Sequence, residues 1–275
     1  MTRTERTGHR GVVLVVVVVV VIAAAAAWGV RALWNAAQPH LDTTSCTVGA
    51  YDLSPDQAVV ASQMVGVVIR RDLPERAAVL VLAAALQESK LRNLPSGSGD
   101  RDSVGVLQQR PSQGWGTVAQ LSDVRYATGA FLDVLVTKTD WQTRSLADVV
   151  QSVQISADGS AYAQHEPQAQ SLADALTGRT PAGITCTFDT PTTVAAAATV
   201  ATELTQDLPV NPPTTTSTSV SAYGAAWATA AWFVANADRL GIEEVGYAGQ
   251  SWSRTHGWRK KTDLPDTVVT ATLHT

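Results

Sequence analysis

The sequence predicts a mainly α-helical protein in three parts: an N-terminal transmembrane helix, an α-helical domain and a small C-terminal α+β module. Three observations lead to this prediction. A run without charged residues fills positions 11–30. Helix-capping signals recur between residues 54 and 178, where strand signals are weak. After Gly241, short segments rich in β-branched and aromatic residues alternate with glycines and prolines.

The first thirty residues have the pattern of a membrane anchor. Arg3, Arg6 and Arg10 precede the uncharged run, and twenty helical residues span about 30 Å, the thickness of a bilayer's hydrocarbon core. Because basic flanks stay in the cytoplasm, the bulk of the chain should lie outside the plasma membrane. We predict a cytoplasmic tail at 1–10, a single-pass signal-anchor at 11–30 and a stalk at 31–45. A cleaved signal peptide is the alternative, since Ala23–Ala27 offers small residues to a peptidase.

Charge and cysteine content narrow the class of protein further. Only 16% of the 275 residues are charged and the net charge is −4, which argues against a nucleic-acid partner.

The two cysteines, Cys46 and Cys186, both fall on the exported side, where an oxidising environment favours a disulfide. In the chain-entropy model, closing a loop of about 140 residues stabilises the fold by about 5 kcal/mol. The pair also marks the helical domain, which we place at 46–188.

Within this domain, capping and loop signals predict the order of the helices. Ser54 caps a helix that reaches about Arg70, with Gln57 placed for a capping box. A second start signal at 72–75 opens a helix that is apolar on every face, as expected for a helix inside a core. Residues 91–102 have loop chemistry. Further helices are predicted at 123–138, 145–155 and 160–176, the last kinked or split by Pro167.

The composition changes after Cys186. Residues 189–221 predict one more helix, at about 192–208, followed by an extended Thr/Pro-rich linker at 211–221. Helical spacing returns at 222–240, and three short strand-like segments follow Gly241. We therefore predict a small α+β module at 222–275, whose protein partner the sequence leaves unknown.

Glu88, at the far end of the apolar helix, is the main catalytic candidate. A carboxyl group on the last turn of a buried helix is partly desolvated and lies near the negative end of the helix dipole. Both effects favour the neutral acid, which is the state that a general acid needs near neutral pH. A solvated glutamate at a helix end is the alternative, and Ser89 is expected to support the helix end.

The residues after Glu88-Ser89 form a pattern with Gly105, Gln108 and Pro111. In this pattern the chain resembles the lytic transglycosylase and goose-type lysozyme superfamily. Members of that superfamily pair Glu-Ser at the end of a buried helix with a downstream Gly-Leu-Met-Gln segment and a proline three residues beyond. Within the superfamily, the chain looks most like membrane-anchored actinobacterial members over about residues 46–186, in the segments 87–94, 99–117 and 161–166.

The resemblance implies a lysozyme-like domain that cleaves the β-1,4 bond between N-acetylmuramic acid and N-acetylglucosamine in peptidoglycan glycan strands. No cofactor or metal is implied. Glu88 would protonate the leaving oxygen and, in the transglycosylases, would then take a proton from the sugar's 6-hydroxyl to give a 1,6-anhydro ring. A hydrolase instead needs a second carboxylate to hold a water. Asp100 and Asp102 are candidates for that role, or else ordinary turn and salt-bridge residues.

The remaining candidates are side chains that could bind the glycan. The amides of Gln108 and Gln109 both donate and accept hydrogen bonds, and Trp115 either stacks on a sugar face or is structural. The family's Ala-Tyr-Asn-Ala-Gly motif has no clear counterpart, because the nearest segment, 152–156, lacks the ring. Tyr162 either replaces that ring or packs in the core.

Two alternatives to an enzyme follow from the sequence. The missing aromatic motif favours a non-catalytic lysozyme-like protein that binds the cell wall or acts as a scaffold. In the other alternative, the C-terminal module recruits a protein partner and the lysozyme-like part is a spacer.

Overall fold

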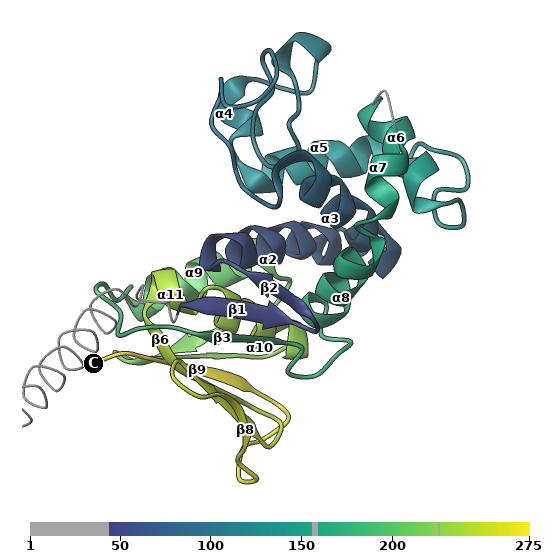
Figure 1. The fold of residues 1–275 in the computed structure, drawn as a ribbon. Coiled ribbons are helices and arrows are strands. Elements are labelled where there is room, and N and C mark those ends of the chain that lie inside the picture. Colours follow the sequence, from purple (N-terminus) through teal and green to yellow (C-terminus); the bar gives the residue numbers. More distant parts are fainter. Residues whose placement is uncertain (1–43, 156–158, 225) are drawn as a thin grey trace, which may run out of the picture. The chain divides into compact units, whose positions relative to one another are not determined.

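The computed structural model describes residues 44–155, 159–224 and 226–275, and residues 44–275 form one compact unit (Figure 1). The predicted cytoplasmic tail and signal-anchor, and nearly all of the stalk, lie outside the described residues. In the part of the chain that is described, no helix has both the length and the apolar character needed to cross a bilayer.

The fold is α+β, so the predicted mainly α class is wrong. The described residues form two antiparallel sheets, one of three strands in the order β2-β1-β3 and one of six in the order β4-β5-β9-β6-β7-β8. The smaller sheet consists of β1 (Ser45–Val48), β2 (Tyr51–Leu53) and β3 (Ile184–Thr187), inside the domain that was predicted to be helical. Strands of three or four residues are too short for an alternating pattern to be recognised in sequence.

The predicted disulfide is confirmed. Cys46 on β1 and Cys186 on β3 are direct neighbours in the antiparallel ladder, and their sulfur atoms are bonded. Both side chains are buried. The bond therefore fastens the first strand of the described chain to the strand that follows the last helix of the helical region.

The first two helices start where the sequence predicts. In α2 (Pro55–Arg70), the Ser54 hydroxyl accepts from the Gln57 backbone N–H, and the Gln57 side chain accepts from the Ser54 N–H. This is the predicted capping box. Helix α3 (Glu75–Ser89) is buried at every position from Ala77 to Leu86, so it does run through the core. Helices α2, α5, α6 and α8 pack around it.

The helices predicted at 123–138 and 145–155 are present to within a few residues, whereas the short helices at 111–113 and 118–121 were not predicted. The segment predicted at 160–176 is divided, because α7 ends at Ala163 and α8 begins at Glu166 with Pro167 in its first turn. Proline is tolerated there, since the first helical N–H groups have no intrahelical acceptor. The elements are η1 (Pro111–Gln113), α4 (Val118–Leu121), α5 (Val124–Leu135), α6 (Leu146–Gln154), α7 (Ser160–Ala163) and α8 (Glu166–Leu176).

The C-terminal residues build the six-stranded sheet. The range predicted as an extended linker contains two of its strands, β4 (Thr214–Thr215) and β5 (Ser219–Ala222), so the linker prediction is wrong there. The alternation of serine with Val220 and Ala222 places the apolar pair on the buried face. The remaining elements are α9 (Ala197–Asp207), α10 (Ala226–Ala235), α11 (Ala237–Leu240), β6 (Ile242–Tyr247), β7 (Gln250–Ser253), β8 (Gly257–Lys260) and β9 (Val269–Leu273).

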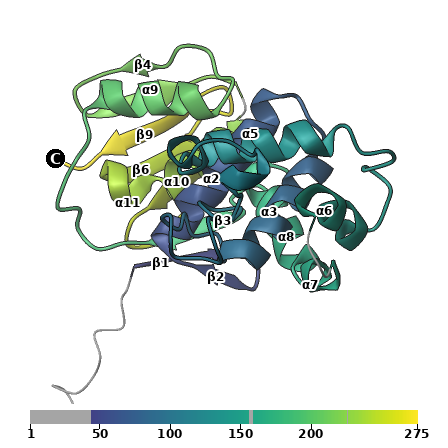
Figure 2. The same ribbon diagram turned by 90° about the horizontal axis from the view of Figure 1, so that it is seen from above.

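Helix α10 joins this sheet to the helical region. It contacts β6 and β9 as well as α2, α8 and β3, and all its residues from Ala228 to Ala235 are buried. Figure 2 shows α9 and α10 beside α2, with β6 and β9 next to them. The sheet therefore packs on the helical region through a continuous apolar contact.

Candidate functional site

Glu88 lies on the last turn of α3, and its neighbour Ser89 ties that turn to the following loop. The buried Ser89 Oγ lies 2.7 Å from the Val106 carbonyl oxygen, to which it donates, and it accepts from the Arg92 N–H at 3.1 Å. Ser89 thus supports the helix end, as the sequence predicted. The contact fixes the position of Glu88 relative to the loop at 104–109.

That loop is a tight turn whose geometry explains the glycine of the motif. Val104 and Gln109 exchange two backbone hydrogen bonds of 2.9 and 3.1 Å across it. Gly105 has φ +79°, and a Cβ at this position would collide with the Leu121 carbonyl oxygen. Only glycine meets both requirements, so the turn requires glycine at position 105 for steric reasons, whether or not a substrate binds.

The carboxyl group of Glu88 is half-buried and held by two side chains. The Tyr162 hydroxyl, from α7, donates to Glu88 Oε1 at 2.7 Å. Gln154, the last residue of α6, also hydrogen-bonds the Glu88 side chain, and its Nε2 donates to the Leu107 carbonyl at 3.0 Å. Desolvation by burial raises the pKa of Glu88 above its ordinary value of 4.5, and the hydrogen bonds from Tyr162 and Gln154 oppose this only in part.

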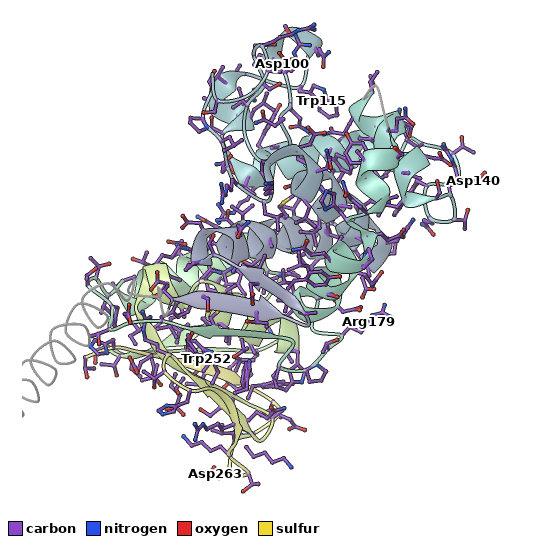
Figure 3. The ribbon with its side chains drawn as sticks, viewed as in Figure 1. Asp100, Trp115, Asp140, Arg179, Trp252 and Asp263 are labelled. Carbon is purple, nitrogen blue, oxygen red and sulfur yellow. A yellow bond between two sulfur atoms is a disulfide. The ribbon has the colours of Figure 1, made fainter. Side chains whose placement is uncertain are left out.

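Glu88 opens into a pocket of about 720 Å³. Four of the other predicted site residues line the same pocket, namely Asp100, Gln108, Gln109 and Trp115. Figure 3 labels Asp100 and Trp115, which lie on neighbouring loops. Tyr162 reaches the site through its hydroxyl alone, since its side chain is only 2% exposed. The structure thus brings the predicted acid and the predicted glycan-binding side chains together.

The two aspartates are placed differently. Asp102 Oδ1 accepts from Arg110 Nε at 2.7 Å and Oδ2 from the Ser112 N–H at 2.8 Å. The Arg110 guanidinium and the Ser112 N–H hold the pKa of Asp102 well below its usual range. Both oxygens already have donors, which favours a loop-holding role over that of a water-activating base. Asp100 has a side chain 88% exposed, with Arg101 Nε at 3.7 Å.

The two glutamines also differ. Gln108 is half-buried, and its Nε2 donates to the Gly105 carbonyl at 2.9 Å. Gln109 is 2% exposed and donates to the Ala127 carbonyl at 3.2 Å. The Gln109 Oε1 atom is buried and accepts no hydrogen bond from any residue that the structure describes. Gln109 therefore lies in the wall of the pocket, with its amide directed into the protein.

Three of the nine non-glycine residues with positive φ in the described part of the chain line this pocket. Arg101, Gln108 and Ile155 line it, and their φ angles are +54°, +45° and +54°. Such left-handed angles are unfavourable for residues other than glycine, asparagine and aspartate, and they are found at functional sites as well as at turns and helix ends. The strain is a second reason, besides the desolvated acid, to place the functional site here.

No family model matches this chain, and no curated protein matches it at a significant level. The function of the chain is therefore inferred from the geometry of the Glu88 pocket.

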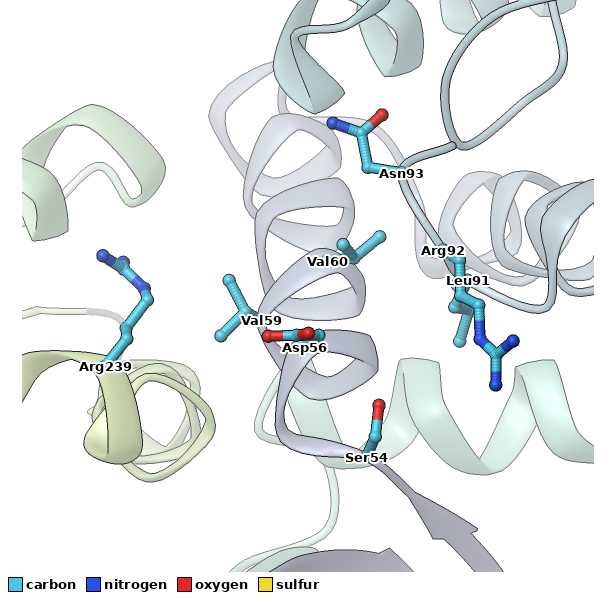
Figure 4. Close-up of a pocket in the computed structure, with 8 residues that line it drawn as sticks. All are labelled: Ser54, Asp56, Val59, Val60, Leu91, Arg92, Asn93 and Arg239. Atoms are coloured by element: carbon cyan, nitrogen blue, oxygen red, sulfur yellow. The ribbon is translucent and has the colours of Figure 1, made fainter. Parts of the chain in front are cut away.

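A second pocket, of about 380 Å³, lies beside the start of α2 (Figure 4). Its one acid, Asp56, is exposed, and Arg239 already bonds Glu203 and Asn236. It therefore lacks the desolvated acid that distinguishes the Glu88 pocket. Its lining residues are Ser54, Asp56, Val59, Val60, Leu91, Arg92, Asn93 and Arg239.

Sequence reasoning missed two residues of the site, Gln154 and Ile155. Both belong to the segment 152–156, which aligns by order with the family's aromatic motif. The ring of that motif is missing here, but the segment keeps an amide, and this amide contacts Glu88. An amide at the position where the motif has asparagine was the signal that could have identified Gln154.

Proposed function

We propose that the protein is a membrane-anchored, extracytoplasmic glycosidase of the lytic transglycosylase type, with Glu88 as general acid and base. Its substrate is the peptidoglycan glycan strand, and its place is the outer, cell-wall side of the plasma membrane. One observation supports this most strongly: a carboxyl group with a raised pKa, held by Tyr162 at 2.7 Å, faces a pocket that also bears Gln108 and Trp115.

The site suits a two-step reaction at a single carboxyl group. Protonated Glu88 gives its proton to the glycosidic oxygen as the bond to the sugar's C1 breaks. The resulting carboxylate then takes the proton of the 6-hydroxyl, whose oxygen bonds to C1 and closes the anhydro ring. Tyr162 and Gln154 hold the carboxyl group in place through both steps.

The lining residues favour this route over hydrolysis. Among the described residues of the pocket, the only carboxylate besides Glu88 is Asp100, which is largely exposed. An inverting hydrolase needs a base that holds a water against the sugar, about 6.5 to 9.5 Å from the acid. Asp102 is committed to Arg110 and Ser112. The intramolecular route needs no second carboxylate.

The products distinguish these reactions. The full-length protein in detergent, incubated with isolated cell walls, is expected to release muropeptides with 1,6-anhydro ends, seen by mass spectrometry. Reducing ends would show a hydrolase instead. Release of no fragments, while the walls still bind the protein, would support the non-catalytic wall-binding alternative, which the missing ring in segment 152–156 favours.

Tyr162→Phe tests how the acid is held. A hydrogen bond to a charged group contributes about 1.5 to 3 kcal/mol, so fragment release is expected to slow by roughly tenfold to a hundredfold. The hydroxyl also lowers the pKa of Glu88, so its loss should move the alkaline limb of the pH–rate profile to higher pH. The measurement is the initial rate of fragment release across pH.

Tyr126→Phe is the matched control. The Tyr126 hydroxyl lies 3.5 Å from the Trp115 carbonyl, beside the pocket but without a contact to Glu88, and the side chain is 37% exposed. Its rate and pH profile should stay close to those of the native protein. If Tyr162→Phe behaves the same way, Tyr162 has no part in positioning the acid.

A further inference from the structure

The second pocket, beside the start of α2, carries two opposite charges that have no protein partner. Asp56 lies in the first turn of α2, and Arg92 lies on the segment that follows α3 (Figure 4). Both residues are exposed, and neither side chain forms an ion pair or a hydrogen bond with any residue that the structure describes. Because the two charges do not neutralise each other, they favour a ligand that carries a charge of each sign.

The apolar lining of this pocket is already in place without a ligand. Val60 and Leu91 are 8% and 0% exposed, and Val59 is half-buried. The segment that carries Leu91 is fastened to the helix, since Gln57 Nε2 of α2 donates to the Lys90 carbonyl at 2.7 Å. A ligand therefore meets a preformed surface, which lowers the cost of binding.

The lining chemistry argues for a short peptide. The volume of about 380 Å³ is near the lower end of the roughly 300 to 1,000 Å³ of small-molecule sites. No lining residue that the structure describes is aromatic, so neither a nucleobase nor a sugar face finds a stacking partner. Asp56 would repel a phosphate or another polyanion. A short peptide, in contrast, offers an ammonium group, a carboxylate and aliphatic side chains together.

One short segment separates this pocket from the Glu88 pocket. Arg92 and Asn93 line the second pocket, whereas the next residue, Leu94, lines the first. The Arg92 N–H donates to Ser89 Oγ at 3.1 Å, so the segment is tied to the helix end that carries Glu88. The two pockets are thus neighbours, and a peptide in the second one has two sources: it is free, or it is attached to a glycan strand in the first.

We propose that the second pocket binds a short peptide that carries both an ammonium group and a carboxylate. Arg92 pairs with the carboxylate, Asp56 pairs with the ammonium group, and an aliphatic side chain of the peptide packs on Val59 and Val60. A guanidinium binds a carboxylate through two parallel hydrogen bonds, which makes Arg92 the stronger of the two charged contacts. The inference goes beyond the proposed glycosidase activity and does not depend on it, because Glu88 takes no part.

Trialanine is the simplest probe, since it has one ammonium group, one carboxylate and only methyl side chains. Full-length native protein in detergent is titrated calorimetrically with trialanine, N-acetyltrialanine and trialanine amide. We expect a dissociation constant on the order of 1 mM for trialanine, and binding roughly threefold to tenfold weaker for each blocked peptide. Arg92→Gln should remove only the preference over the amide, and Asp56→Asn only the preference over the N-acetyl peptide.

Arg144→Gln is the control, because Arg144 is likewise exposed but does not line this pocket. It should leave all three affinities unchanged. The thermal midpoints of all three variants should match that of the native protein, since the charges that they remove are exposed. A lost preference therefore reports on the ligand contact and not on folding.

A second pair of probes identifies the source of the peptide. The disaccharide tetrapeptide from digested walls is compared with the same disaccharide without its peptide. Tighter binding of the peptide-bearing form than of trialanine, reduced in Arg92→Gln, indicates a peptide attached to glycan, and equal binding of the two indicates a free peptide. If neither probe binds, or if Arg92→Gln and Asp56→Asn bind both as the native protein does, the inference is overturned. Fragment release from cell walls tests the proposed function separately.

Discussion

Glu88→Gln is expected to abolish the release of glycan fragments from cell walls. General acid–base catalysis contributes roughly 10² to 10⁴ in rate, and in the proposed mechanism one group serves as both acid and base, so we expect a loss near the upper end. The amide keeps the shape of the carboxyl group and still offers an oxygen to the Tyr162 hydroxyl, so the pocket should persist. The measurement is the initial rate of fragment release, followed by chromatography and mass spectrometry.

The raised pKa of Glu88 predicts the pH dependence of both activity and stability. Activity should fall as the pH rises through that pKa, because the acid loses its proton. Since the pKa is higher in the folded than in the unfolded chain, the stabilising contribution is complete below the unfolded value and is lost as the pH rises through the folded one. Glu88→Gln cannot ionise, so its urea midpoint should exceed that of the native protein at about pH 7, and the difference should vanish towards about pH 4.

Asp100→Asn is the matched control, because Asp100 is the other carboxylate of the pocket. We expect its rate of fragment release to stay within about threefold of the native rate if the anhydro route operates. A large loss in Asp100→Asn would instead point to a hydrolase in which Asp100 holds the water. Undiminished cleavage by Glu88→Gln would contradict the catalytic role of Glu88, and equal urea midpoints at neutral pH would contradict its desolvation.

Long helices with explicit end signals and the strand-like segments after Gly241 could be predicted from the sequence, whereas the short strands β1, β2, β4 and β5 could not. Two helix signals depend only on residues that are close in sequence, namely the capping box of Ser54 and Gln57 and the apolar stretch of α3. Such signals can therefore be recognised without knowledge of the tertiary structure. Strands β1 and β5 are stabilised by partners distant in the chain, as in the pairings of Cys46 with Cys186 and of Val220 with Ala271. Their Ser, Thr and Ala residues resemble linker composition, and only the pairing makes them strands.

The candidate site divides in the same way. Glu88, Gly105 and Gln108 lie close enough in sequence to form a recognisable pattern. The contacts of Gln154 and Tyr162 with Glu88 depend instead on how α6 and α7 pack against α3, which no local pattern reports. The sequence left two roles open for Tyr162, a place at the site or simple packing in the core. The 2.7 Å hydrogen bond to Glu88 favours the role at the site.

Asp207→Ala is expected to destabilise the protein by about 3 to 5 kcal/mol, because it breaks a buried charged network. The Asp207 side chain is fully buried at the end of α9. Its Oδ1 accepts from Arg125 Nε of α5 at 2.6 Å, and its Oδ2 accepts from Trp232 Nε1 of α10 at 2.7 Å. Without the carboxylate, the guanidinium loses its partner and the indole N–H is left buried without an acceptor. Urea unfolding measures the loss.

Asp133→Ala provides the comparison, because the Arg71–Asp133 ion pair has a similarly short separation, 2.7 Å, but an aspartate that is 70% exposed. Its loss should cost less than about 1 kcal/mol.

Asp207 also connects the C-terminal half of the chain, to which α9 belongs, with the helical region that bears Glu88. Its backbone lies against α2, since a Cβ on Gly66 of α2 would lie 2.7 Å from the Asp207 carbonyl oxygen. We therefore expect tryptophan fluorescence and fragment release to be lost at the same urea concentration, in the native protein and, at lower urea, in Asp207→Ala. If fluorescence changed while cleavage persisted, the sheet and the Glu88 pocket would unfold independently, and Asp207 would stabilise only the C-terminal half.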